Sequence, residues 1–116
     1  MKVDACKITA VTVTSFSTNC YIVRSEDSKT CVVIDPGGDG NGILKKVNEL
    51  GLIVKYVFCT HGHPDHTGGV EDLCRETGAE FFIGKGDENL IEKPPQFIVD
   101  LLPSFKNPPK NYKTFS

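Results

Sequence analysis

The sequence lacks several features that point to particular classes of protein. It has no run of about 18 or more apolar residues, so we expect no membrane-spanning helix and no membrane partner. Its net charge of -2 shows no basic excess, which argues against a nucleic-acid partner. The N-terminal residues show no long apolar run and no cleavage-site pattern of a secretory signal, and we therefore expect a cytoplasmic protein.

The cysteines do not form a recognisable disulfide or metal-binding pattern. They are odd in number and widely spaced, and no Cys-x-x-Cys pair occurs among them. Most lie within or at the ends of apolar runs. We interpret them as reduced thiols that pack as small hydrophobic side chains, and a redox or zinc-thiolate site is the less favoured alternative. The five residues are Cys6, Cys20, Cys31, Cys59 and Cys74.

The hydrophobic pattern predicts strands that alternate with helices within one domain. Residues 7–14 alternate apolar residues with threonine, which predicts a strand with one buried face. Residues 19–24 and 30–34 should form a hairpin, and the continuous apolar run of 30–34 predicts burial on both faces. Strands over 54–59 and 80–83 should be parallel. Predicted helices cover 43–50, ending at Gly51, and 67–77, ending at Gly78.

These elements indicate an α/β fold with a mixed sheet and flanking helices. We assign them to residues 1–92. From residue 93 the composition changes, because five of the seven prolines fall between Pro94 and Pro109. We predict that residues 93–116 form a Pro-rich irregular segment that lies across the rest of the molecule.

The strongest chemical signal is a His-x-His-x-Asp-His cluster that directly follows the predicted strand 54–59. It consists of His61, His63, Asp65 and His66, and it contains all three histidines of the chain. Side chains two positions apart in an extended backbone project to the same side, so His61 and His63 can reach one metal ion together. Imidazole and carboxylate ligands suit Zn²⁺, and also iron or manganese. Surface histidines in a turn are the alternative interpretation.

This cluster resembles the metal-binding signature of the metallo-β-lactamase superfamily, and the similarity is greatest to small glyoxalase II-like hydrolases. Residues 19–23, Asn-Cys-Tyr-Ile-Val, resemble the second strand of that family. Residues 33–37, Val-Ile-Asp-Pro-Gly, resemble its third strand and the following turn. The resemblance covers about residues 8–85 and implies the N-terminal half of an αββα sandwich.

The resemblance also implies roles for individual residues. His61 and His63 would ligate a first metal ion, and Asp65 and His66 a second one, with Asp65 as the candidate catalytic carboxylate. Asp35 would be a second-shell residue beside the site, and its alternative role is a turn carboxylate that caps the Pro-Gly-Gly loop. One or two zinc ions would supply a metal-bound hydroxide that attacks a thioester or similar carbonyl, as in hydroxyacylglutathione hydrolase. The expected substrate is a small molecule such as a glutathione thioester.

The chain departs from this family because no histidine follows His66 to complete two metal sites. We expect a truncated hydrolase, in which a missing second half or a second copy of the chain would cover the sheet. A non-catalytic metal-binding or assembly module is one alternative. An iron-dependent sulfur dioxygenase of the same superfamily is another. A flavodiiron oxygen reductase is disfavoured because such proteins resemble this signature but carry glutamate where His63 stands.

Overall fold

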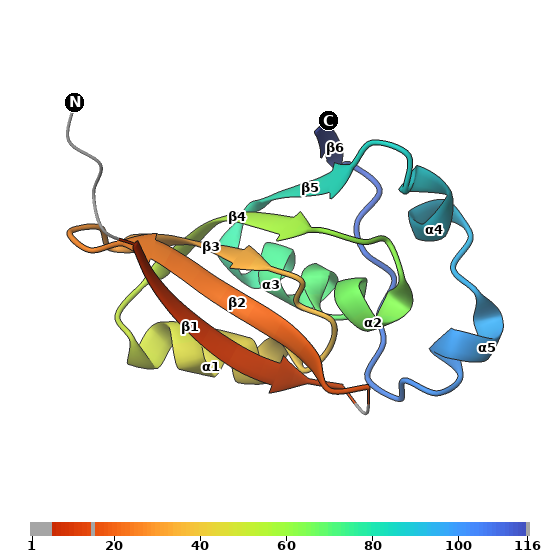
Figure 1. Cartoon of the computed structure of the whole chain (residues 1–116), viewed down its shortest axis with the longest axis horizontal. Helices are drawn as coiled ribbons and strands as arrows, with labels where there is room; N and C mark the ends of the chain where they lie inside the picture. The colour runs from red at the N-terminus through yellow and green to blue at the C-terminus, as the bar shows by residue number, and fades with distance from the viewer. Residues whose placement is uncertain (1–5, 15, 116) are drawn as a thin grey trace.

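The fold is built on one mixed β-sheet (Figure 1). The computed structural model describes residues 6–14 and 16–115, and within them six strands pair in the order β1-β2-β3-β4-β5-β6. The strands are β1 (Cys6–Val13), β2 (Thr18–Ser25), β3 (Thr30–Ile34), β4 (Ile53–Cys59), β5 (Glu80–Gly84) and β6 (Lys113–Phe115). The helices are α1 (Gly40–Glu49), α2 (Pro64–Thr67), α3 (Val70–Thr77), α4 (Glu88–Glu92) and α5 (Gln96–Val99).

The strand directions change in the middle of the sheet. Strands β1, β2 and β3 are antiparallel, and the pairing of Tyr21 with Ile34 confirms the predicted hairpin. Strands β3 to β6 are parallel, and the pairing of Phe58 with Phe82 confirms the predicted arrangement of β4 and β5. Helices α1 and α3 connect consecutive parallel strands, as such connections require. The predicted α/β class with a mixed sheet is therefore confirmed.

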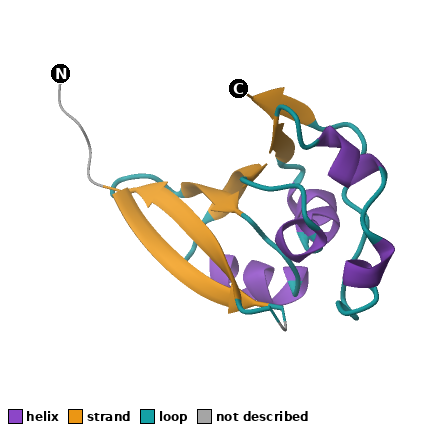
Figure 2. Cartoon of the chain, turned by 45° about the vertical axis from the view of Figure 1, so that its right-hand side comes forward, coloured by secondary structure: helices purple, strands orange, loops and turns teal. Residues whose placement is uncertain are grey.

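Helices α1 and α3 cover one face of the sheet, and the core lies between them and the strands (Figures 1 and 2). Ile43 and Val47 of α1 and Leu73 of α3 are almost completely buried there. Burying each such side chain stabilises the fold by about 1.5–3 kcal/mol. The strand side chains that belong to this core include Cys20, Ile22, Cys31, Val33, Val57, Cys59 and Ile83.

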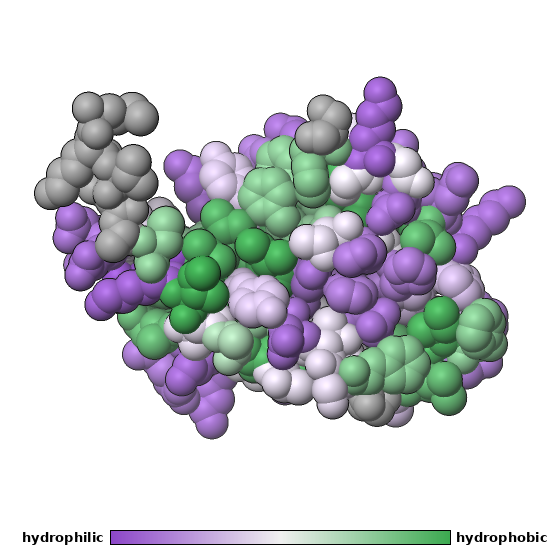
Figure 3. Space-filling model, viewed as in Figure 1, coloured by the Kyte–Doolittle hydropathy of each residue, from purple (hydrophilic) through white to green (hydrophobic). Residues whose placement is uncertain are grey.

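The opposite face of the sheet carries apolar side chains that remain partly exposed, and Figure 3 shows them gathered over the strands. Burial on both faces of residues 30–34 was therefore a wrong prediction. Val32 and Ile34 are only half-buried, because no second layer covers this face within the described part of the chain. We call four side chains of strands β4, β5 and β6 the aromatic face: Tyr56, Phe58, Phe82 and Phe115.

The helix predicted over 67–77 is present as α3 but begins later, and a separate short helix, α2, precedes it. Helix α2 begins at Pro64 and already contains Asp65 and His66, whereas α3 begins at Val70. Gly68 and Gly69 separate them, since each lies too close to neighbouring backbone to carry a side chain. Helix α3 ends at Gly78 with a positive φ of 71°, as predicted.

The segment 93–116, for which irregular structure is predicted, contains two short regular elements within its described part. Its described part contains helix α5 and the edge strand β6, which pairs with β5. Leu102 is buried, and Lys106 donates its backbone N–H to the carbonyl of Gly68. The segment thus returns across α2 and α3 before it joins the sheet. Helix α4, which precedes the segment 93–116, was not predicted from the sequence. Every helix among the described residues is too short or too polar to cross a lipid bilayer.

Candidate metal centre

The histidine cluster lies where the chain leaves the carboxyl end of β4. His61 and His63 follow the strand on a short loop and are exposed. Asp65 and His66 lie on the single turn of α2 and are half-buried. Pro64 occupies the first turn of this helix, where its fixed φ favours helix initiation and its missing N–H costs nothing. The turn of α2 brings the last two residues of the cluster back towards the first.

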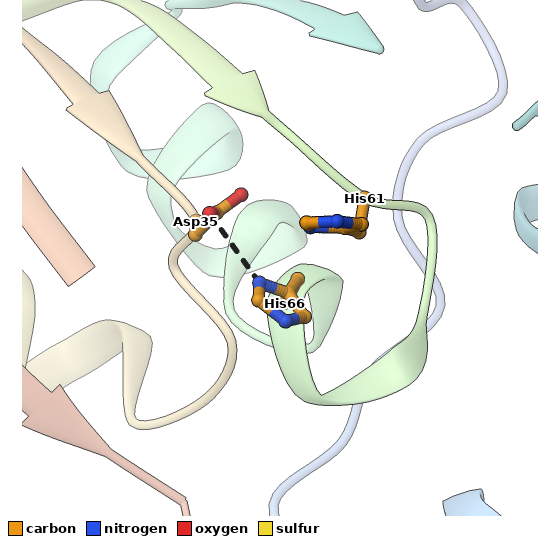
Figure 4. Close-up of side chains that lie close together, drawn as sticks. All are labelled: Asp35, His61 and His66. Atoms are coloured by element: carbon orange, nitrogen blue, oxygen red, sulfur yellow. Dashed lines mark ion pairs between the residues drawn. The ribbon is translucent and has the colours of Figure 1, made fainter. Parts of the chain in front are cut away.

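The imidazole ring of His66 lies closer to that of His61 than the ring of His63 does. The ring centroid of His61 lies 5.0 Å from that of His66 and 6.1 Å from that of His63. Asp65 Oδ2 lies 3.6 Å from His66 Nε2. One ligand atom each from Asp35, His61 and His66 lies within 4.8 Å of the others, and Figure 4 shows these three side chains facing one another. This spacing is short enough for all three to contact one ion.

Asp35 lies at the carboxyl end of β3, the strand next to β4. Its backbone has a positive φ of 55°, which aspartate tolerates better than most residues. Its carboxylate accepts hydrogen bonds from the backbone N–H of Thr60 (2.7 Å) and from the Thr60 hydroxyl (2.6 Å). Burial alone would raise the pKa of Asp35, but its interactions with His66 and Thr60 outweigh burial and lower that pKa. The carboxylate is therefore ionised at neutral pH.

The hydrogen bonds of Thr60 also favour one tautomer of the neutral His61 ring. Thr60 has one hydroxyl proton, and it donates that proton to the ionised Asp35. The same oxygen lies 3.0 Å from Nδ1 of His61, so it must accept a hydrogen bond from Nδ1–H. In neutral His61 this leaves Nε2 unprotonated, which is the form that binds a metal ion.

His66 has Asp35 on one side of its ring and Asp65 on the other. Nδ1 lies 3.3 Å from Asp35 Oδ2, in a geometry poorly directed for a hydrogen bond. Interaction with Asp35 raises the pKa of His66, burial opposes this effect, and the charges of Asp35 and Asp65 reinforce it. The ring of His66 thus lies between two carboxylates, and these nitrogen and oxygen donors are ones that zinc, iron and manganese accept. The residues present therefore fit a divalent metal ion.

The structure adds three polar side chains that the sequence analysis did not identify. Thr60 contacts Asp35 and His61, as described above. Thr18, at the start of β2, donates a hydrogen bond of 3.0 Å from its hydroxyl to Asp65 Oδ2. Asp87, just before α4, accepts a hydrogen bond of 3.1 Å from the backbone N–H of Gly62. Only Thr60 stood beside the cluster in sequence. Thr18 and Asp87 carried no local signal that linked them to it.

A close approach of two backbone segments fixes α2 beside Asp35. The turn after Asp35 runs against the carbonyl of Asp65, and a Cβ at Gly37 would overlap that carbonyl. The backbone N–H of Gly69 donates to the carbonyl of Pro36 at 2.7 Å. The Pro-Gly turn therefore serves as the surface on which α2 rests, which explains why glycine is needed at position 37.

Comparison with known proteins relates this arrangement to a family. A model of the metallo-beta-lactamase superfamily matches residues 13–113. The chain is 34% identical over 90 residues to hydroxyacylglutathione hydrolase GloC of Haemophilus influenzae, covering 77% of this chain and 42% of that protein. It is 43% identical over 65 residues to a hydroxyacylglutathione hydrolase of Albidiferax ferrireducens, covering 56% of this chain and 25% of that protein.

A solved structure shows the same similarity in three dimensions. TTHA1623, in a di-iron-bound form, matches with a TM-score of 0.82 and 25% identity, covering 93% of this chain and 54% of that chain. The chain thus spans less than half the length of these two curated relatives and about half of this solved structure.

Proposed function

Since this chain belongs to the metallo-beta-lactamase superfamily, we propose that it is a metal-dependent hydrolase that cleaves a glutathione thioester with ions bound at its histidine cluster. The observation that carries the proposal is the convergence of Asp35, His61 and His66, whose ligand atoms lie within 4.8 Å of one another. The substrate class is supported by the relatives that are named hydroxyacylglutathione hydrolases.

In this proposal the cluster provides two pairs of ligands. His61 and His63 hold a first ion, and Asp65 and His66 hold a second one. Zinc, iron and manganese all suit these donors. When bound, such ions lower the pKa of a coordinated water to near 7 and polarise the carbonyl that is attacked.

The surrounding residues orient these ligands. Asp35 stays ionised and faces Nδ1 of His66, which leaves Nε2 of that ring on the side of Asp65. Thr60 holds Nδ1 of His61 and leaves its Nε2 free. A carboxylate or hydroxyl behind a metal-binding imidazole fixes its tautomer and ring orientation. In this proposal Asp35 orients His66 from behind, and its distance from His61 and His66 also allows it to contact an ion.

The proposal is tested by loading the 116-residue chain separately with zinc, iron or manganese and following hydrolysis of a hydroxyacylglutathione. We expect metal-dependent release of glutathione, abolished by a chelator and by His61→Ala. Asp100→Ala, an exposed carboxylate on the C-terminal side of α5, should not change the rate. Tight metal binding without hydrolysis above the metal-free background would contradict the proposal.

A second candidate is a non-catalytic assembly module, and the aromatic face is the observation that favours it. Phe58 and Phe82 stack with ring centroids 4.8 Å apart, and Phe115 packs edge-on against Phe58, yet all three stay partly exposed. Apolar patches of this kind commonly mark interaction surfaces. In this candidate a second copy of the chain packs on the face. Sedimentation should then show a dimer that Phe82→Ser converts to a monomer, whereas a wild-type monomer at all concentrations would exclude this role.

A further inference from the structure

The loop between β5 and α4 supports the backbone of the histidine cluster. Gly62 is buried, although His61 and His63 on either side of it are exposed. Its N–H donates a hydrogen bond of 3.1 Å to Asp87 Oδ2. A Cβ at Gly62 would lie 2.8 Å from the carbonyl oxygen of Asp87 and 2.9 Å from Cβ of Leu90. The peptide between the two histidines therefore lies flat against the first turn of α4.

Asp87 is itself held in place by the sheet and by its own helix. Its N–H donates to the carbonyl of Gly84, the last residue of β5, and its carbonyl accepts from the N–H of Leu90. Gly86 has a φ of 106°, which few residues other than glycine adopt, so the turn before Asp87 requires glycine at this position. Ile91 anchors α4 in the core with 1% exposure. The backbone of Asp87 is thus held relative to β5, and its carboxylate lies next to Gly62.

This arrangement matters because Gly62 sits between two expected ligands of one ion. Glycine has more backbone freedom than any other residue, so rotation about Gly62 would turn His61 and His63 away from each other. The hydrogen bond to Asp87 restricts that rotation. We propose that Asp87 is a positioning residue for the first metal ion, holding the Gly62 peptide so that both imidazoles face the same point. The inference rests on the metal site of the proposed function.

The test is a titration of the full chain with Co²⁺, in which affinity and the visible spectrum of the bound ion are both measured. Asp87→Ala should weaken binding of the first ion by about 10–100-fold, as loss of outer-shell partners does, and change the spectrum. Asp87→Asn should stay within about threefold of wild type, because its amide oxygen can still accept from Gly62. Asp100→Ala is the matched control and should bind as wild type does.

The possible outcomes distinguish an effect on the orientation of His61 and His63 from an effect of the negative charge of Asp87. Wild-type affinity and spectrum in Asp87→Ala would overturn the inference. Equal losses in Asp87→Asn and Asp87→Ala would also overturn it, because they would show that charge rather than the hydrogen bond matters. Failure of the wild-type chain to bind Co²⁺ would overturn both this inference and the proposed function. A chain that binds Co²⁺ with the expected order of variants but hydrolyses no thioester would contradict only the function.

Discussion

The hydroxyl of Thr18 donates a hydrogen bond of 3.0 Å to Oδ2 of Asp65, joining the start of β2 to the single turn of α2. Thr18 is buried, with 7% exposure, and its oxygen also accepts a longer hydrogen bond of 3.4 Å from the Thr14 hydroxyl. The carboxylate is therefore held from behind, and its rotation is restricted by a group that is not itself charged. A proposed metal ligand thus depends on a residue from a distant strand.

We expect Thr18→Val to weaken metal binding while the fold persists. The substitution keeps the shape of the side chain but removes the hydrogen bond, so Asp65 would rotate more freely, at a cost of about tenfold or more in affinity. The free energy of unfolding should fall by about 1 kcal/mol. Chelator competition and urea unfolding measure the two effects. Thr12→Val, at an exposed position of β1, is the control and should change neither.

Substitution of Gly37 should damage the site through packing rather than chemistry. A Cβ at Gly37 would overlap the carbonyl of Asp65, so α2 would have to move. We expect Gly37→Ala to lower the free energy of unfolding by about 1–3 kcal/mol and to abolish tight metal binding. Gly84→Ala is the control, because its Cβ would meet only Phe115, at 3.9 Å. Similar stability of the two variants would contradict this account of the turn.

Much of the sheet was predictable because its pattern is local. The alternation in 7–14 and the apolar runs of 30–34 and 54–59 each predict a strand from neighbouring residues alone. The histidine cluster was visible for the same reason, since all four of its members fall within six positions. Its placement at the carboxyl end of β4 followed from the order of strand and motif.

The remaining features depend on contacts between residues distant in sequence. Thr18 and Asp65 are 47 positions apart, and Gly62 and Asp87 are 25 apart. The hydrophobic periodicity of a sequence does not reveal such pairs. The break between α2 and α3 was missed because it results from the backbone of residues 36–38 lying against Gly68 and Gly69. The exposure of one sheet face was missed because an apolar run does not show whether a second layer is present.

Acid should weaken the attachment of the C-terminal segment to α3. Oδ1 of Asp72 accepts hydrogen bonds from Lys106 Nζ at 2.7 Å and from Arg75 at 2.8 Å. The bond to Lys106 lowers the pKa of Asp72 below its ordinary 3.8, burial opposes this, and Arg75 adds to the lowering. A lowered folded-state pKa means that the stabilisation is present above about pH 4 and is lost as pH falls through the folded value.

This effect can be isolated with a neutral variant. We expect Asp72→Asn to lower the free energy of unfolding by about 1 kcal/mol at pH 7, the upper range for partly exposed ion pairs. At pH 3 the variant should lie closer to wild type. Urea unfolding at both pH values measures the difference in the free energy of unfolding between the variant and wild type. Asp27→Asn, on an exposed turn, controls for the general loss of a carboxylate. An equal loss in the free energy of unfolding at both pH values would show that the charge of Asp72 is not involved.

The reactivity of the cysteine thiols should depend on how tightly the residues beneath the candidate metal centre are packed. Burial, reinforced by Asp35, raises the pKa of Cys20 to about 12, and Cys59 has a pKa raised well above its ordinary value for the same reasons. Cys6 is exposed. Because the thiolate is the reactive species, DTNB at pH 8 should label Cys6 rapidly, and it should label Cys20 and Cys59 only when the chain opens.

The slow phase identifies the region that opens. The Cys59 thiol donates to the carbonyl of His66 at 3.3 Å, so it lies directly beneath α2 and becomes accessible when that turn lifts from the sheet. We expect Cys6→Ser to remove the fast phase, and Cys59→Ala to remove part of the slow one. Added Zn²⁺ should slow labelling of Cys59, because an ion bound by Asp65 and His66 would stabilise the folded turn of α2 above this thiol. Unchanged labelling at saturating Zn²⁺ would show that α2 does not participate in binding.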